Sequence, residues 1–366
     1  MNMALCSRWF TNLCILLFSF QASNASQLSD TFYSKLNYLL SHLPDSRNSQ
    51  GSTDVGAVTE VGNWPTTPIP NLGQISGVSV NPVGQPVVFH RGPRIWDYES
   101  FNESNHFQQI PEGPIPVNTI LTLDPENGNV LSSWGADFFY LPHGIHIDPE
   151  GNTWLTDVAL HQVFKFSLGS SRPVLTFGHR FKPGSGFGHL CKPTSVAVAQ
   201  NGHVFVADGY CNSRILKFNQ FGDLIRVFPQ NQEFASLKVP HSLTLLERQG
   251  LLCIADRENM RVVCINAALD RTTARSQLSI QQPDLGRVFA VTSKGDIVLA
   301  VNGPTSPHLP VRGFIIDPLS ETVVDRWEPT SDVFHQPHDL AVSPDGLYLY
   351  VAELEPNRLW KFNLLL

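Results

Sequence analysis

Residues 142–166 read PHGIHIDPEGNTWLTDVALHQVFKF. A Pro-His pair opens a first apolar stretch, a turn with Gly151 follows, and two further apolar stretches end at Asp157 and Phe166. Apolar and polar residues alternate in these stretches and have no helical spacing, which indicates strands. The segment is therefore expected to form three strands joined by tight turns.

This pattern recurs along the chain at intervals of about fifty residues, which gives six copies. Repeat units of this length with about four strands each are typical of propeller blades. The sheet of one blade cannot bury both of its faces alone, so neighbouring blades must stack around a central channel. We therefore predict an all-β fold, a six-bladed β-propeller over residues 55–366. The copies begin near Gly77, Pro142, Pro193, Pro240, Val288 and Pro337.

The ring also needs a closing strand. The last copy ends at Leu366, directly after its third strand. A strand near Ala57 to Val61 is predicted to enter the last blade as its fourth strand. This exchange would tie the two ends of the domain together and cover a free sheet edge.

The first 54 residues differ from the repeats. Arg8 precedes the apolar run Leu13 to Phe20, and small residues stand before Ala25, so residues 1–25 are predicted to be a secretory signal peptide. A membrane anchor is the alternative, but the run is shorter than the ~20 residues of a spanning helix. We expect no anchor, and a protein that is secreted or stays in the lumen of the secretory pathway, as in secretory granules. Residues 26–54 are expected to form an N-terminal extension with apolar residues at helical spacing.

Composition narrows the class of partner. The 366 residues include 26 Gly and 27 Pro, spread along the chain as many short strands with tight turns require. The net charge is -7 and no basic block occurs, so nucleic acid is not expected as the main partner. Asn102 begins a sequon and is a candidate glycosylation site.

Four cysteines remain once the signal peptide is removed. An even number in an oxidising compartment indicates two disulfides. Cys253 and Cys264 are expected to lie opposite each other on a hairpin. Cys191 and Cys211 are expected at the same rim of the propeller. The predicted pairs are therefore Cys191–Cys211 and Cys253–Cys264.

Three of the six copies begin with Pro-His, and these three histidines, His143, His241 and His338, are each about two repeats apart. In a six-bladed ring they occupy alternate blades at equivalent positions and converge on the channel. Three imidazoles with an open fourth position are the ligand set of a catalytic zinc ion. The alternative is that Pro-His only marks the entry to a strand. His90 and His161 lack this spacing but can also face the channel.

Other polar residues at the same rim are candidates for binding and catalysis. Asp339 either holds a second, harder cation such as calcium or caps a turn. Arg91, Tyr210 and Arg257 each follow a second strand. An arginine there can bind a substrate carboxylate, and a tyrosine near zinc can exchange a proton with substrate. The alternative for each is an ordinary surface loop residue.

Five runs carry a family resemblance: Phe89–Gly92 with Trp96-Asp97, Tyr140–Gly144, Thr156–Lys165, Asp208–Arg214 and Ala255–Asn259. In these runs the sequence resembles the peptidyl-α-hydroxyglycine α-amidating lyases, the lyase half of peptidylglycine α-amidating monooxygenase. The resemblance extends over residues 55–366. It implies NHL-like repeats and an enzyme that cleaves peptidyl-α-hydroxyglycine into an amidated peptide, such as a peptide hormone or neuropeptide, and glyoxylate.

The resemblance also implies two metal ions. His143, His241 and His338 would bind a catalytic zinc. Asp339 would bind a structural calcium together with the backbone carbonyls of two residues, Val78 and Ile145.

Roles in catalysis follow from the same resemblance. Arg91 would hold the substrate carboxylate, Tyr210 would take the hydroxyl proton, and Arg257 is a further catalytic candidate. The family often has a methionine before the last Pro-His, where this chain has Gln336, a candidate substrate-binding residue. No nucleotide cofactor is implied.

The resemblance further indicates a stand-alone lyase, expected to be a monomer. Its substrate would come from a separate copper-dependent monooxygenase. Two other functions remain open from the residues alone. One is a calcium-dependent lactonase or esterase on a six-bladed propeller, and the other is a binding propeller without catalysis.

Overall fold

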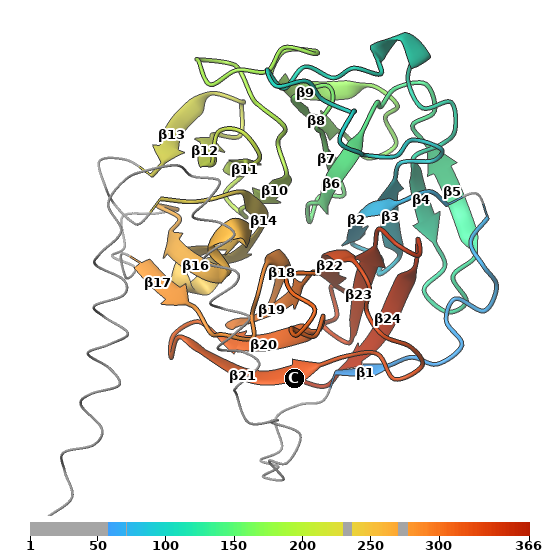
Figure 1. The fold of residues 1–366 in the computed structure, drawn as a ribbon, viewed down its shortest axis with the longest axis vertical. Helices are drawn as coiled ribbons and strands as arrows, with labels where there is room; N and C mark the ends of the chain where they lie inside the picture. Colours follow the sequence, from blue (N-terminus) through green and yellow to red (C-terminus); the bar gives the residue numbers. More distant parts are fainter. Residues whose placement is uncertain (1–57, 71, 230–235, 270–276) are drawn as a thin grey trace, which may run out of the picture. The chain divides into compact units, whose positions relative to one another are not determined.

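The computed structural model describes residues 58–70, 72–229, 236–269 and 277–366. They form six four-stranded antiparallel sheets, arranged as blades around a common centre (Figure 1). The predicted all-β six-bladed propeller is confirmed. The predicted signal peptide, residues 1–25, and the extension, residues 26–54, lie outside the described residues.

In blades 1 to 5 the strands follow the chain from the inside of the blade to its outside. Blade 1 contains β2 (Ile75–Val80), β3 (Pro86–His90), β4 (Ile120–Leu123) and β5 (Val130–Trp134). Blade 2 contains β6 (Pro142–Ile147), β7 (Thr153–Asp157), β8 (Gln162–Phe166) and β9 (Pro173–Phe177). Blade 3 contains β10 (Ser195–Val198), β11 (Val204–Asp208), β12 (Arg214–Phe218) and β13 (Leu224–Phe228).

The second half of the ring repeats this order. Blade 4 contains β14 (Pro240–Leu246), β15 (Leu251–Asp256), β16 (Arg261–Asn266) and β17 (Gln277–Ile280). Blade 5 contains β18 (Val288–Lys294), β19 (Ile297–Asn302), β20 (Gly313–Asp317) and β21 (Thr322–Trp327). Blade 6 contains β22 (Pro337–Val342), β23 (Tyr348–Glu353), β24 (Leu359–Leu364) and β1 (Val58–Glu60).

The last blade is built from both ends of the described chain. β1 pairs antiparallel with β24, with Val58 opposite Leu364 and Glu60 opposite Phe362. The carboxylate of Glu60 also accepts hydrogen bonds from the backbone N–H groups of Thr330 (2.6 Å) and Ser331 (2.8 Å). This strand therefore joins the loop before blade 6 to its outer edge.

The apolar core lies between the blades. One buried cluster combines Val262 and Cys264 of blade 4 with Val291 and Phe314 of blade 5. Similar clusters join the other blades, because each sheet presents apolar side chains to both neighbours. Burial between sheets explains why the repeats form a closed ring rather than independent units.

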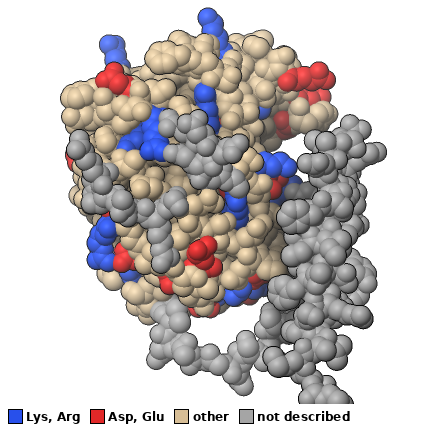
Figure 2. All heavy atoms as spheres, turned by 90° about the vertical axis from the view of Figure 1, so that its left-hand side faces the viewer, with Lys and Arg blue, Asp and Glu red and all other residues tan. Residues whose placement is uncertain are grey.

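Among the described residues, helical structure is limited to short 3-10 turns at η2 (Ile110–Glu112), η3 (Glu247–Gln249) and η4 (Arg257–Asn259). Within the described ranges no helix is long and apolar enough to cross a membrane. Figure 2 shows one side of the molecule, where basic and acidic side chains are interspersed among uncharged ones.

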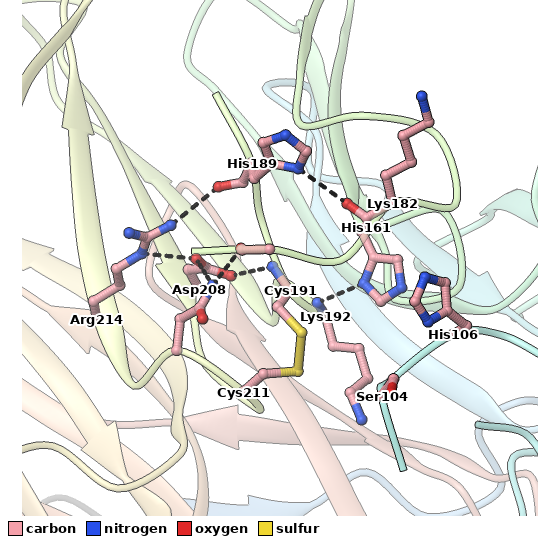
Figure 3. Close-up of a disulfide and its surroundings, with 12 residues drawn as sticks. Ser104, His106, His161, Lys182, His189, Cys191, Lys192, Asp208, Cys211 and Arg214 are labelled. Carbon is pink, nitrogen blue, oxygen red and sulfur yellow. Dashed lines mark hydrogen bonds and ion pairs between the residues drawn. A yellow bond between two sulfur atoms is a disulfide. The ribbon is translucent and has the colours of Figure 1, made fainter. Parts of the chain in front are cut away.

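Both predicted disulfides are confirmed. Cys253 and Cys264 face each other across β15 and β16, with their Cα atoms 3.9 Å apart. The Cα atoms of Cys191 and Cys211 are 5.5 Å apart, and this bridge joins the entry of blade 3 to the loop after β11 (Figure 3).

Candidate metal centre and active site

The three histidines of the Pro-His pairs stand where inner strands bulge. In β14 and β22 the pairing register shifts on either side of His241 and His338, and β6 has the same shift around His143. A β-bulge bends the strand and redirects the extra residue. The repeated bulge explains how three separate strands direct equivalent imidazoles to one place.

Each of these imidazoles is fixed by the next blade. Its Nδ1 atom lies against a backbone carbonyl oxygen, which can only accept a hydrogen bond, so Nδ1 carries the proton. The lone pair of Nε2 is then free for a metal ion, as in other histidine ligands with a hydrogen-bonded second nitrogen. The pairs are His143 with Thr194 (2.8 Å), His241 with Phe289 (2.7 Å) and His338 with Ser76 (2.6 Å).

A glycine permits one of these contacts. Gly144 lies so close to blade 3 that a Cβ atom on it would be 2.4 Å from the carbonyl oxygen of Thr194. Any larger residue would push the inner strand of blade 2 away from the carbonyl that orients His143.

The histidine cluster fits a zinc ion. The ligand atoms of His143, His241 and His338 lie within 4.8 Å of one another, and the residues are only 2%, 2% and 4% exposed. Burial holds the pKa of His143 and His241 well below the usual range and lowers the pKa of His338 to about 3. The imidazoles are therefore neutral at physiological pH, as metal binding requires. Three neutral imidazoles are the donor set of a catalytic zinc with an open position.

Tyr210 reaches this cluster from the loop after β11. Its hydroxyl oxygen lies 3.1 Å from Nε2 of His143 and 3.1 Å from Nε2 of His241. Burial raises the pKa of Tyr210, whereas the positive charges of Arg257 and Arg91 act in the opposite direction. The hydroxyl is thus placed to exchange a proton with a molecule bound at the histidines.

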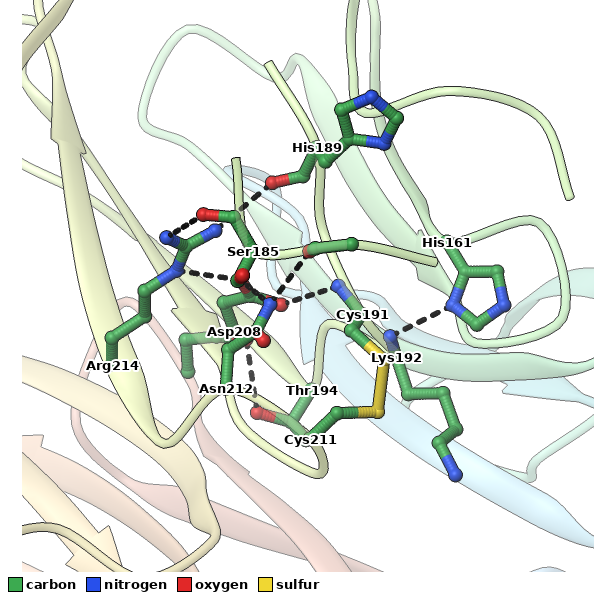
Figure 4. A network of polar contacts seen from close by, with 12 residues as sticks. His161, Ser185, His189, Cys191, Lys192, Thr194, Asp208, Cys211, Asn212 and Arg214 are labelled. Atoms are coloured by element: carbon green, nitrogen blue, oxygen red, sulfur yellow. Dashed lines mark hydrogen bonds and ion pairs between the residues drawn. A yellow bond between two sulfur atoms is a disulfide. The ribbon is translucent and has the colours of Figure 1, made fainter. Parts of the chain in front are cut away.

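The loop that carries Tyr210 is tightly held (Figure 4). The buried carboxylate of Asp208 accepts hydrogen bonds from the backbone N–H of Cys191 (2.7 Å) and the side-chain amide of Asn212 (2.7 Å), and pairs with Arg214 (2.9 Å). The disulfide to Cys211 adds a covalent connection on the next residue. These contacts fix the backbone on both sides of Tyr210.

Arg257 also contacts the ring of Tyr210. Its guanidinium carbon is 5.2 Å from the centroid of Tyr210 and 5.0 Å from that of Phe289. Glu258 pairs with Arg257 (3.0 Å) and with Arg287 (3.2 Å), so one carboxylate holds two arginines near the site.

Arg91 is buried, with 2% of its surface exposed. Its Nε donates to the carbonyl of Pro142 (3.0 Å) and one terminal nitrogen donates to Oε1 of Gln74 (2.8 Å). None of the described carboxylates forms an ion pair with it. Burial lowers its pKa to about 10, so it stays charged and can bind an anionic substrate group.

A cavity of about 460 Å³ extends from the three histidines along the inner strands. Asp339 lines it, together with Val78 and Ile145. The Asp339 carboxylate accepts hydrogen bonds from the backbone N–H groups of Val78 (2.9 Å) and Leu340 (3.0 Å). Burial raises the pKa of Asp339 to about 7. Asp339 thus accepts hydrogen bonds from backbone groups. It is only partly exposed, to the channel, and pairs with no described Lys or Arg, so its carboxylate also suits a bound cation.

The remaining predicted residues have different surroundings. His90 and His161 do not belong to the histidine cluster, because each holds the backbone of a loop. Nδ1 of His90 accepts a hydrogen bond from the backbone N–H of Gly92 (3.1 Å), and Nδ1 of His161 accepts one from the backbone N–H of Lys192 (3.0 Å).

The hydrogen bonds of two other candidates, Gln336 and Asn102, lie outside the described site. The backbone N–H of Gln336 donates a hydrogen bond to Glu353 (3.0 Å), and no hydrogen bond joins its side chain to the described site. Asn102 is exposed, and its side-chain oxygen accepts N–H groups of its own loop.

Two aromatic residues of the site did not emerge as candidates from the sequence. Phe289 takes the bulge position of blade 5, and its ring lies 5.3 Å from His241 and 6.0 Å from His338. Trp96 lies 4.9 Å from the ring of Tyr210. The position of Phe289 in its repeat, equivalent to that of the histidines, could have identified it. Trp96 lies outside the repeat pattern, and its one signal was its place in a run that carries the family resemblance.

Both the sequence and the fold of this chain are similar to those of known proteins. The NHL repeat family model matches residues 190–218 and 237–265, in blades 3 and 4. The structure of a nidogen/laminin complex is similar in fold, with a TM-score of 0.52 and 17% identity over 72% of this chain and 83% of that chain.

Two relatives are much closer in sequence. Peptidyl-alpha-hydroxyglycine alpha-amidating lyase 2 of Drosophila melanogaster is 56% identical over 310 residues, which are 83% of this chain and 75% of the relative. Peptidylglycine alpha-amidating monooxygenase of Rattus norvegicus is 41% identical over 304 residues, 80% of this chain and 30% of the relative. The chain thus spans most of the fly protein but under a third of the rat protein.

Proposed function

This chain belongs to the peptidyl-α-hydroxyglycine α-amidating lyase family, and we propose that it cleaves peptidyl-α-hydroxyglycine into an amidated peptide and glyoxylate. The observation that carries the proposal is the Tyr210 hydroxyl, 3.1 Å from two histidines of a buried three-histidine cluster. A proton-transferring group at a metal site is the minimum that this reaction needs.

His143, His241 and His338 are proposed to hold a zinc ion, and their unprotonated Nε2 atoms, which lie close together, support this assignment. When bound there, zinc would supply Lewis acidity that makes a substrate hydroxyl easier to deprotonate. Asp339 is proposed to hold a structural calcium with the backbone carbonyls of Val78 and Ile145. Its partly buried carboxylate, which lines the channel, supports that role.

The chain's own residues account for substrate binding and for the proton. The substrate bears a carboxylate, a hydroxyl and an amide nitrogen on one carbon. Buried Arg91 binds the carboxylate, and this fixes the orientation of that carbon. Tyr210 acts as a base in its phenolate form, which the positive charges of Arg257 and Arg91 favour. The phenolate accepts the hydroxyl proton, and the electron pair left on oxygen forms the C=O bond of glyoxylate. The C–N electron pair leaves on nitrogen, which takes the proton from Tyr210 to become the peptide amide.

Arg257 and Phe289 shape the surroundings of this step. The Arg257 guanidinium over the Tyr210 ring stabilises the negative charge that forms when the tyrosine is deprotonated. The ring of Phe289 beside two histidines restricts water in that sector. No redox partner is needed, because the reaction is an elimination.

The hydroxylated substrate must be made by another enzyme activity. The rat relative is named a monooxygenase, and the part that is similar to this chain covers only 30% of its length. We propose that a separate copper-dependent monooxygenase hydroxylates the glycine and that this chain acts afterwards. Both steps would then take place in the secretory pathway or after secretion.

The test is glyoxylate release from a synthetic peptidyl-α-hydroxyglycine by the purified, disulfide-bonded protein. We expect turnover that chelation abolishes and zinc restores, and that His241→Ala lacks. Turnover that survives complete metal removal would contradict the zinc proposal alone. No turnover by zinc-loaded wild-type protein would overturn the lyase proposal, and lactones and esters with calcium would be the substrates to try next.

A further inference from the structure

The ring of Trp96 lies close to three side chains of the candidate site. It lies in the long connection between β3 and β4, and its ring centroid is 5.4 Å from the guanidinium carbon of Arg91. The same ring is 4.9 Å from the ring of Tyr210 and 6.2 Å from that of His143. It therefore touches both the arginine proposed to bind substrate and the tyrosine proposed to take its proton.

Trp96 supplies an aromatic contact to each of these two neighbours. The guanidinium of Arg91 is held at two nitrogens by Pro142 and Gln74, and its carbon lies over the ring of Trp96. The ring of Tyr210 contacts both Trp96 and the guanidinium of Arg257. Replacing the indole with a smaller side chain would free one face of each group at the same time.

The connection is built to hold Trp96 in this place. Arg94, 7% exposed, pairs with Glu112 (2.8 Å), donates to the carbonyl of Gly113 (2.9 Å) and lies over the ring of Phe107. Phe101 packs on Trp96 with a ring separation of 5.6 Å and also on Phe107.

The neighbours of Trp96 in sequence behave differently. Ile95 and Tyr98 are 59% and 90% exposed, whereas Trp96 is partly buried against the site. Within residues 95–99, Trp96 is thus the one side chain that is not exposed.

We propose that Trp96 is a positioning residue, which sets the separation between the Arg91 guanidinium and the Tyr210 hydroxyl. The inference rests on the proposed lyase function. The carboxylate and the hydroxyl of the substrate are attached to the same carbon, so the two protein groups must stand at one fixed separation. A displacement of about 1 Å in such a site can lower the rate about 100-fold.

The first experiment compares Trp96→Leu with Trp96→Phe in zinc-loaded protein. We expect Trp96→Leu to lower kcat about 10- to 100-fold with a smaller change in KM, and Trp96→Phe to retain kcat within about threefold because it keeps an aromatic face. Tyr98→Leu, in the same connection but exposed, is the matched control and should leave kcat unchanged. Zinc content and the melting temperature report separately whether each variant is folded and loaded.

A double-mutant cycle tests whether Trp96 acts through the tyrosine. If it does, Trp96→Leu should lower kcat much less in a Tyr210→Phe background than in wild type, because the positioned group is already absent. A purely structural residue would lower kcat equally in both backgrounds, and this result would overturn the inference. If Trp96→Leu does not fold, Trp96→Met gives the same comparison with a flexible side chain that fills irregular space.

Binding gives a readout that needs no turnover. An N-acylglycine has the carboxylate but no hydroxyl and cannot be cleaved, so calorimetry measures its affinity for the Arg91 site alone. We expect Trp96→Leu to weaken it several-fold. Unchanged kcat and unchanged affinity in Trp96→Leu would refute the inference, whereas a wild-type protein without lyase activity would refute the proposed function instead.

Discussion

The hydroxyl oxygen of Tyr210 lies 3.1 Å from Nε2 of His241. The same oxygen is equally close to Nε2 of His143. The Nδ1 atoms of both histidines are hydrogen-bonded to backbone carbonyls. The tyrosine hydroxyl therefore lies next to the Nε2 atoms, which would bind a metal ion. Acid-base chemistry and metal binding thus share one location, although the residues come from three blades.

Tyr210→Phe should lower kcat about 100- to 10,000-fold, the usual contribution of a general acid or base. Its ring would keep the contacts with Trp96 and Arg257, so zinc binding and KM should change little. Steady-state kinetics and metal analysis measure these effects. Tyr350→Phe is the control, because Tyr350 is fully buried in blade 6 and its hydroxyl has no hydrogen-bond partner among the described residues. Equal losses in the two variants would show that Tyr210 has no special role.

Much of this site follows from the repeat. The spacing of His143, His241 and His338 predicts that they lie on alternate blades. Their common position after a proline predicts that they lie at the same rim of the propeller. Together these two features are sufficient to predict that the three side chains converge. The pairing of Cys253 with Cys264 follows in the same way from opposed positions on a hairpin.

Other features depend on contacts that a repeat pattern does not contain. The carbonyls that orient the histidines belong to Ser76, Thr194 and Phe289, and any residue type can supply a carbonyl. Trp96 lies in a connection outside the repeat, and its orientation depends on the packing of Arg94 and Phe107.

The two disulfides should differ in their effect on activity. They close loops with separations of 20 and 11 residues, so removing either pair by Cys→Ala substitution should destabilise the fold by about 3 kcal/mol. Only Cys211 adjoins Tyr210. We expect loss of the Cys191–Cys211 bridge to lower kcat about tenfold, and loss of the Cys253–Cys264 bridge to leave it within about twofold.

The two double variants serve as controls for each other. Denaturant unfolding measures stability, and kinetics well below the melting temperature measures activity of the folded protein. Equal changes of kcat in both variants would mean that the first bridge does not position the tyrosine loop.

Calcium should stabilise the protein through Asp339. A cation that binds only the folded state at about 100 times its Kd adds about 2.7 kcal/mol, which corresponds to a melting temperature higher by about 5 °C in a domain of this size. We expect this increase on adding calcium to calcium-free wild-type protein at neutral pH. Asp339→Asn is nearly isosteric but lacks the charge and should show no increase. A similar increase in both proteins would place the calcium elsewhere.

His161 should make the fold less stable in acid. The residue is fully buried, and burial is the main reason that its pKa is lowered from 6.5 to about 4, with Lys192 and His106 acting in the same direction (Figure 3). Between pH 6.5 and 4 the unfolded chain binds a proton at this residue and the folded chain does not. The free energy of unfolding must therefore fall as the pH falls through this window, by up to about 3 kcal/mol from this one group.

His161→Asn tests this dependence with little disturbance of the backbone. An asparagine oxygen can accept the N–H of Lys192 in place of Nδ1, and asparagine tolerates the positive φ of 55° at this position. Urea unfolding at pH 7 and pH 4.5 should show that the variant loses about 2 to 3 kcal/mol less stability on acidification than wild type. His308→Asn, at an exposed histidine, should lose as much as wild type. If His161→Asn loses as much as wild type, another group is responsible for the acid sensitivity, because all other titrations cancel in the comparison.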